Sequence, residues 1–99
     1  MATSKPKSVK PKTFNLHWGS GIVEEEALIS TDYHQPCIQL LKFTEGEAEG
    51  QYEIRFCFYN HRGRFQRSPM IIDEDSLGEM RAALNATPKL KRMLKRLVG

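Results

Sequence analysis

The pattern of apolar and polar residues divides this chain into a strand-like part before Asp73 and a helix-like part after it. Alternation with a period of two, typical of strands with one buried face, runs through residues 13–18 and 52–59. Residues 37–44 are partly apolar on both faces, which favours a central strand covered on one side by helix. Residues 22–31 include three consecutive glutamates that favour helix, but they follow a Gly-Ser-Gly turn, and we interpret them as a strand or a bent strand.

Residues 52–72, YEIRFCFYNHRGRFQRSPMII, predict a β-hairpin. Its turn, NHRG, contains Asn60 and Gly63, which tolerate the positive φ of hairpin turns. On the return strand Phe65 and Arg67 share a face, and Pro69 marks an edge or a bulge because it has no N–H to donate. The first strand should place its more apolar side in the core, namely Tyr52, Ile54, Phe56 and Phe58. The opposite side should be half polar, with Glu53, Arg55, Cys57 and Tyr59.

Helical periodicity begins at Asp73, which we expect to cap a helix. Thr87-Pro88 predicts a second helix, with Thr87 as its N-cap and Pro88 in the first helical position. The apolar positions of the second helix recur at the spacing of one helix face and are Leu90, Met93, Leu94, Leu97 and Val98. We expect the first four of them to be buried, in the core or between subunits.

These elements predict an α+β fold, because a run of strands followed by helices is typical of that class. The sequence predicts an antiparallel sheet of four or five strands, followed by one or two C-terminal helices packed on one face. We assign residues 13–99 to this single domain. Residues 1–12 contain four lysines and no acidic residue, and we expect a disordered basic tail there.

Composition is that of a globular domain, with 39% hydrophobic and 27% charged residues. No apolar run approaches the roughly 20 residues of a membrane span, and no secretory signal is recognisable, so we expect a cytoplasmic protein without membrane contact. Cys37 and Cys57 match no zinc spacing and should be buried free thiols. A disulfide between neighbouring strands is the alternative, and it would require an oxidising compartment.

The net charge of +3 conceals a strong segregation of charge along the chain. Residues 13–52 contain seven acidic residues and one lysine, whereas residues 53–72 contain four arginines and one glutamate. Such asymmetry indicates an anionic partner for the basic segments, or only a solvated surface.

Arginines alternate with aromatic residues along the hairpin. Guanidinium groups pair with phosphates and aromatic rings stack on bases, so this pattern favours binding of single-stranded DNA or RNA. The alternative is that the rings form the core and the arginines the solvated face. The candidate nucleic-acid contacts are Arg55, Tyr59, Arg62, Arg64 and Arg67.

No catalytic constellation, metal-ligand spacing or cofactor motif is recognisable. His17, His34 and His61 are scattered, and Gly19-Ser20-Gly21 lacks the lysine and following helix of a phosphate loop. The sequence therefore predicts a non-enzymatic protein without cofactor or metal. If it does not bind nucleic acid, a protein-interaction or homodimerisation module is the alternative.

The order of strands, basic hairpin and helix resembles the single-stranded-DNA-binding transcriptional coactivators of the positive-cofactor-four-like family, which are related to the plant Whirly proteins. The resemblance covers roughly residues 52–84, with Ile54-Arg55 in the third strand, Gly63 in the turn, Ile71-Ile72 entering the helix, and residues 73–84 in place of the family's helix. Pro69 and the helix start at Thr87-Pro88 depart from the family pattern. The resemblance implies a homodimer, which we expect to form through the C-terminal helices, and a sheet face that binds single strands.

Overall fold

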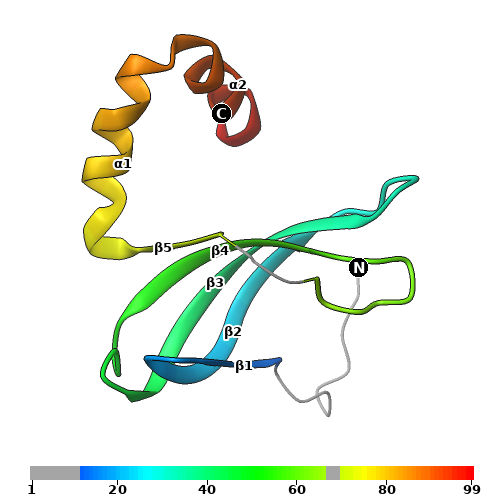
Figure 1. Ribbon diagram of the computed structural model, residues 1–99, viewed down its shortest axis with the longest axis vertical. Coiled ribbons are helices and arrows are strands. Elements are labelled where there is room, and N and C mark those ends of the chain that lie inside the picture. Colours follow the sequence, from blue (N-terminus) through cyan, green and yellow to red (C-terminus); the bar gives the residue numbers. More distant parts are fainter. Residues whose placement is uncertain (1–11, 67–69) are drawn as a thin grey trace.

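The computed structural model describes residues 12–66 and 70–99 (Figure 1). Five antiparallel strands follow one another in the sheet in chain order. They are β1 (Thr13–Leu16), β2 (Gly19–Leu28), β3 (Gln35–Gly46), β4 (Tyr52–Tyr59) and β5 (Met70–Asp73). Helices α1 (Leu77–Ala83) and α2 (Pro88–Val98) follow, with short 3-10 turns η1 (Glu74–Ser76) and η2 (Leu84–Ala86) before and after α1. The expected α+β fold, an antiparallel sheet followed by two C-terminal helices, is confirmed.

The strand register assigns side chains to two faces of this sheet. Cys37 pairs with Cys57, and Gln39 pairs with Arg55, on the face that we call the inner face. Because successive side chains of a strand point to opposite sides, the pairs between them, such as Ile38 with Phe56, lie on the other face. We call that face the helix-side face, since side chains near the end of α2 line cavities together with its residues.

The hydrophobic core lies on the inner face, where the sheet curls and β1 covers part of β3 (Figure 1). Phe14 of β1 meets Phe43 of β3 edge to face, with ring centroids 4.8 Å apart. Leu41 and Ala48 complete the buried cluster, against which Val23 also packs. A curled sheet can thus bury a small core without help from the helices.

Gly21 permits this close approach of β2 to β3. A Cβ atom at this position would lie 1.9 Å from the backbone carbonyl oxygen of Lys42. No side chain fits there, because the backbone of Lys42 cannot move away from Gly21 without breaking the pairing of β2 with β3. A register shift between Val23 and Glu25 then leaves Glu24 as an extra residue, in the manner of a β-bulge that strengthens the local curl.

The prediction of which face of β4 is buried was wrong. Glu53, Arg55 and Cys57 are the buried residues of this strand, whereas Phe58 is 41% exposed and Ile54 and Phe56 are half-buried. The reason is tertiary: the curl of β1 and β2 covers the inner face, while the helices stand away from the other face. Alternation identified two faces correctly, but it did not show which one the fold would enclose.

The helices only partly cover the helix-side face. α1 leads away from the end of β5, and α2 returns toward the sheet (Figure 1). No residue of either helix is buried. Leu97 and Val98 line a cavity of about 530 Å³ together with Ile38, Leu40 and Ile54 of the sheet.

The apolar stripe of α2 is therefore not buried within the chain, contrary to that part of the prediction. Leu94 is half-buried, whereas Met93 is 63% exposed and Leu90 and Leu97 are also exposed. Burial between subunits stays a prediction. None of the helices in the described part of the chain is long and apolar enough to span a membrane.

Local details of the helix starts differ from expectation. Asp73 ends β5, and its side chain makes no capping hydrogen bond to η1. Pro88 begins α2 as predicted, but the hydroxyl of Thr87 donates to the carbonyl oxygen of Leu84, 3.2 Å away, and does not cap α2.

Lys12 is the first described residue and lies against β2, where its carbonyl oxygen accepts a hydrogen bond of 2.8 Å from the amide of Val23. The rest of the predicted tail, residues 1–11, lies outside the described residues.

Candidate nucleic-acid interface

A buried polar network crosses the inner face beside the core. The guanidinium Nε of Arg55 donates to Oε1 of Gln39 at 2.7 Å, and Nε2 of Gln39 donates to a carboxylate oxygen of Glu26 at 2.7 Å. Gln39 is 1% exposed, so its amide depends on these partners for its hydrogen bonds. A cation on one side and a carboxylate on the other fix which way the amide points.

Lys12 continues the network at its open end. Its Nζ lies 2.7 Å and 2.9 Å from the two carboxylate oxygens of Glu26 and stands over the ring of Tyr59, 4.9 Å from the centroid. Burial alone would lower the pKa of Lys12, but the hydrogen bond to Glu26 and the nearby Tyr59 outweigh it and raise that pKa. Burial likewise favours a raised pKa for Glu26, yet hydrogen bonds from Lys12 and Gln39 hold it below its usual range.

Arg55 and Tyr59, two of the predicted contacts, are parts of this network. Arg55 is only 8% exposed, and Tyr59 is half-buried. Both support Phe65: the guanidinium lies 4.6 Å from its ring centroid, and the Tyr59 ring meets it edge to face at 5.5 Å. The structure thus places Arg55 and Tyr59 behind an aromatic ring that is itself 40% exposed.

Arg62 and Arg64 lie in the exposed loop after β4. The side chain of Asn60 accepts hydrogen bonds from the amides of Arg62 (2.9 Å) and Arg64 (3.0 Å), and Gly63 has a φ of 78°. The positive φ expected in this turn is therefore confirmed at Gly63, whereas Asn60 contributes through its side-chain oxygen. Of the predicted return strand, Phe65 forms an antiparallel bridge to Tyr59, and β5 begins at Met70. Residues 67–69, including the predicted edge or bulge at Pro69, lie outside the described residues.

The loop between β2 and β3 presents an exposed aromatic residue beside this turn. The Thr31 hydroxyl accepts hydrogen bonds from the amides of Tyr33 (3.2 Å) and His34 (3.1 Å), which orders the loop. Tyr33 is 85% exposed. The two loops touch, since a ring nitrogen of His61 lies 2.8 Å from the carbonyl oxygen of Asp32.

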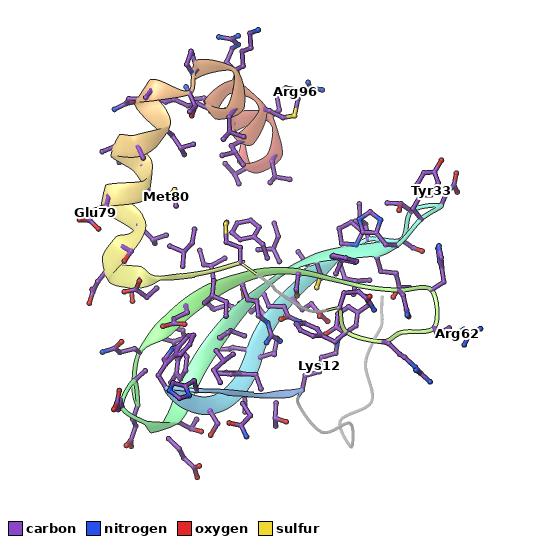
Figure 2. All side chains as sticks on the ribbon, in the orientation of Figure 1. Lys12, Tyr33, Arg62, Glu79, Met80 and Arg96 are labelled. Carbon is purple, nitrogen blue, oxygen red and sulfur yellow. The ribbon has the colours of Figure 1, made fainter. Side chains whose placement is uncertain are left out.

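We call residues 29–34 and 60–66 the loop end of the sheet. It carries two arginines and two exposed aromatic rings, and Figure 2 shows Tyr33 and Arg62 on the same side of the molecule but apart from each other. Sequence reasoning missed Tyr33 and Phe65 as candidate contacts. An aromatic residue in a polar loop with no apolar neighbours, as in Ser30-Thr31-Asp32-Tyr33-His34, was the available signal for Tyr33. Arg67, the fifth predicted contact, lies outside the described residues.

A second basic surface lies on α2, opposite its apolar stripe. Figure 2 shows Arg96 of this helix far from Arg62. This surface contains no aromatic side chain, so it offers charge without stacking. Its cations are Lys89, Lys91, Arg92, Lys95 and Arg96.

Glu53 is the one buried polar group, among the described residues, with an unpartnered side-chain atom. Nε1 of Trp18 donates to its Oε2 at 3.4 Å, whereas Oε1 is buried without a hydrogen bond. Burial raises the pKa of Glu53, and Asp73, opposite it on β5, raises it further against the opposing effect of Trp18. The charged form of Glu53 is therefore unfavourable in the folded protein.

We expect Glu53→Gln to stabilise the protein at neutral pH. A carboxyl whose pKa is raised on folding favours the folded state below its unfolded pKa of about 4 and loses that contribution as pH rises through the folded pKa. Gln is the neutral analogue of the protonated acid. Urea unfolding from acid to neutral pH should show the variant's advantage growing with pH. A constant difference across that range would contradict the assignment.

Among the described residues, no three His, Cys, Asp or Glu side chains come together as a metal site would require. Comparison of the chain with protein-family models, curated proteins and solved structures found no match.

Proposed function

We propose that this chain is a small non-enzymatic protein that binds single-stranded nucleic acid, DNA or RNA, through its loop end. The contact between His61 and Asp32 carries the proposal, because it holds the loop of Arg62 and Arg64 against the loop of Tyr33. Positive charge beside exposed rings suits a flexible strand, whose phosphates pair with guanidinium groups while its unpaired bases stack on aromatic side chains.

Double-stranded nucleic acid is a poorer ligand for such a surface. Bases in a duplex are already stacked on one another, so the rings of Tyr33 and Phe65 would gain contact only with a base that has left the stack. The resemblance to positive-cofactor-four-like coactivators supports the same ligand class. The proposal differs from that family's pattern in placing the strand at the loop end, since the inner face holds the Arg55–Gln39–Glu26 network.

Binding should depend on Arg62 and Arg64 more than on the arginines of α1 and α2. Anisotropy of a fluorescent single-stranded oligonucleotide, measured at several salt concentrations, should show weaker and less salt-dependent binding for the double variant Arg62→Ala/Arg64→Ala. The slope of log affinity against log salt falls by about 0.7 for each lost phosphate contact with a single strand. In the same assay Tyr33→Ala should weaken binding by about 1–3 kcal/mol if one base stacks on it.

The matched control is Arg81→Ala/Arg92→Ala, which removes the same charge from α1 and α2. It should leave affinity close to that of the parent. Equal losses in the two double variants would show a diffuse effect of net charge and remove the loop end from the site.

A second function, homodimerisation through the C-terminal helices, is favoured by one observation. Along the apolar stripe of α2, Leu90, Met93, Leu97 and Val98 are all exposed. Exposed apolar patches mark interaction sites more often than isolated apolar residues do. This function is compatible with the first, because the α2 stripe and the loop end share no residue.

The dimer should dissociate when the stripe is made polar. We expect the parent to show a concentration-dependent dimer in sedimentation equilibrium and Met93→Lys/Leu97→Lys to remain monomeric. Lys95→Ala, on the cationic side of the same helix, is the control and should dimerise like the parent. A parent that is monomeric at every concentration would exclude this function.

A further inference from the structure

Cys37 and Cys57 form a buried pair of thiols that no part of the proposed interface uses. They are direct partners in the register of β3 and β4. Their Sγ atoms lie 3.2 Å apart, both thiols are free, and the residues are 4% and 9% exposed. The chain contains no other cysteine, so a disulfide within one molecule has a single pairing.

The backbone already meets the requirements of a disulfide. Directly opposed residues of an antiparallel pair have Cα atoms about 4.5–5.5 Å apart, within the roughly 4.4–6.8 Å that disulfides span. The sulfur atoms need to approach from 3.2 Å to about 2.0 Å, which rotation of the side chains can supply. The strands need not change register.

We propose that Cys37 and Cys57 form a reversible cross-strand disulfide when the protein meets an oxidant of the peroxide class. One thiolate attacks a peroxide oxygen, the O–O bond breaks, and a sulfenic acid and water result after protonation. The second thiolate then attacks the sulfenic sulfur, the S–S bond forms, and hydroxide leaves and is protonated to water. In total, two thiols and one hydrogen peroxide give one disulfide and two waters.

A small uncharged oxidant is the suitable reagent because both thiols are buried. The reaction should be slow at neutral pH, since burial, together with the hydrogen bond between the two thiols, raises the pKa of Cys37 to about 12. The thiolate is the reacting species. The rate of disulfide formation should therefore rise as the pH is raised.

The disulfide would form next to the residues that support the loop end. The neighbouring pair on the inner face is Gln39 with Arg55, and Arg55 stacks on Phe65. A covalent link two residues away joins β3 and β4 where they hold this network. The disulfide itself does not depend on nucleic-acid binding, and its test uses no nucleic acid.

The test treats the full chain with hydrogen peroxide under native conditions, then unfolds it and alkylates any free thiol. The expected product is a monomer whose mass is lower by two hydrogen atoms, with neither cysteine alkylated. Peptide mapping should link Cys37 to Cys57, and dithiothreitol should restore two alkylatable thiols. The oxidised monomer should keep its circular-dichroism spectrum. Cys37→Ser and Cys57→Ser are the controls, and neither should give a disulfide-linked monomer.

Three results would overturn the proposal. They are two alkylated cysteines after peroxide treatment, sulfinic acid as the main product, and a disulfide that forms only between molecules or with loss of the native spectrum.

Discussion

Phe43→Ala should destabilise the protein by about 3–5 kcal/mol, the usual range for removing a buried phenylalanine. Phe43 is 1% exposed and packs against Phe14 and Leu41 at the centre of a core with few members. The curl of β1 over β3 holds the cavity walls apart, so the space left by the ring cannot close easily. Chemical unfolding monitored by fluorescence or circular dichroism would measure the loss of unfolding free energy.

Phe58→Ala is the matched control, because it makes the same change on the other face of the sheet. Phe58 contacts His34 edge to face at 5.1 Å but remains 41% exposed. Its loss should cost only about 1 kcal/mol, near the value of one aromatic pair. If Phe58→Ala cost as much as Phe43→Ala, the helix-side face would be as much a core as the inner face.

Arg55→Met should destabilise the protein by about 1.5–3 kcal/mol. The substitution keeps an unbranched apolar stem but removes the donor to Oε1 of Gln39, and a hydrogen bond to a charged group is worth about that amount. The Gln39 oxygen would be left buried with no partner. Urea unfolding would measure the effect, with Arg64→Met as the control at an exposed arginine, where a change within about 0.5 kcal/mol is expected.

This pair of variants also separates two roles for Arg55. An arginine that only contacted nucleic acid could be replaced without loss of stability, as expected for Arg64. If Arg55 instead supports Phe65 from a buried position, its replacement should lower the stability of the protein. It should also lower the affinity for single strands, because the ring of Phe65 would be displaced. An Arg55→Met variant as stable as the parent would contradict the support role.

Local patterns predicted the elements of this fold well. Alternation located the strand of residues 52–59, and Asn60 and Gly63 identified its turn, because these signals depend on a few neighbouring residues. Pro88 identified the start of α2 for the same reason. The three glutamates of β2 favour helix by their local propensity, but these residues form a strand because the pairing with β3 overrides that preference.

The core face and the candidate site depended on distant residues and could not be predicted in the same way. Arg55 reads as a surface residue in the sequence, and only the pairing of β4 with β3 places it beside Gln39, 16 positions away. The contact between His61 and Asp32 joins loops 29 positions apart. That contact brings the loop of Tyr33 against the loop of the arginines, and no local pattern connects the two loops.

The most direct measurement for the loop end is a titration of the isotopically labelled full chain with an unlabelled single-stranded oligonucleotide, followed by two-dimensional NMR. The account predicts that the amide signals of Tyr33, Arg62, Arg64 and Phe65 shift most, and that those of α2 shift little. The account would be contradicted if the largest shifts fell on residues 89–96 of α2, or if a titration at low salt moved no signal.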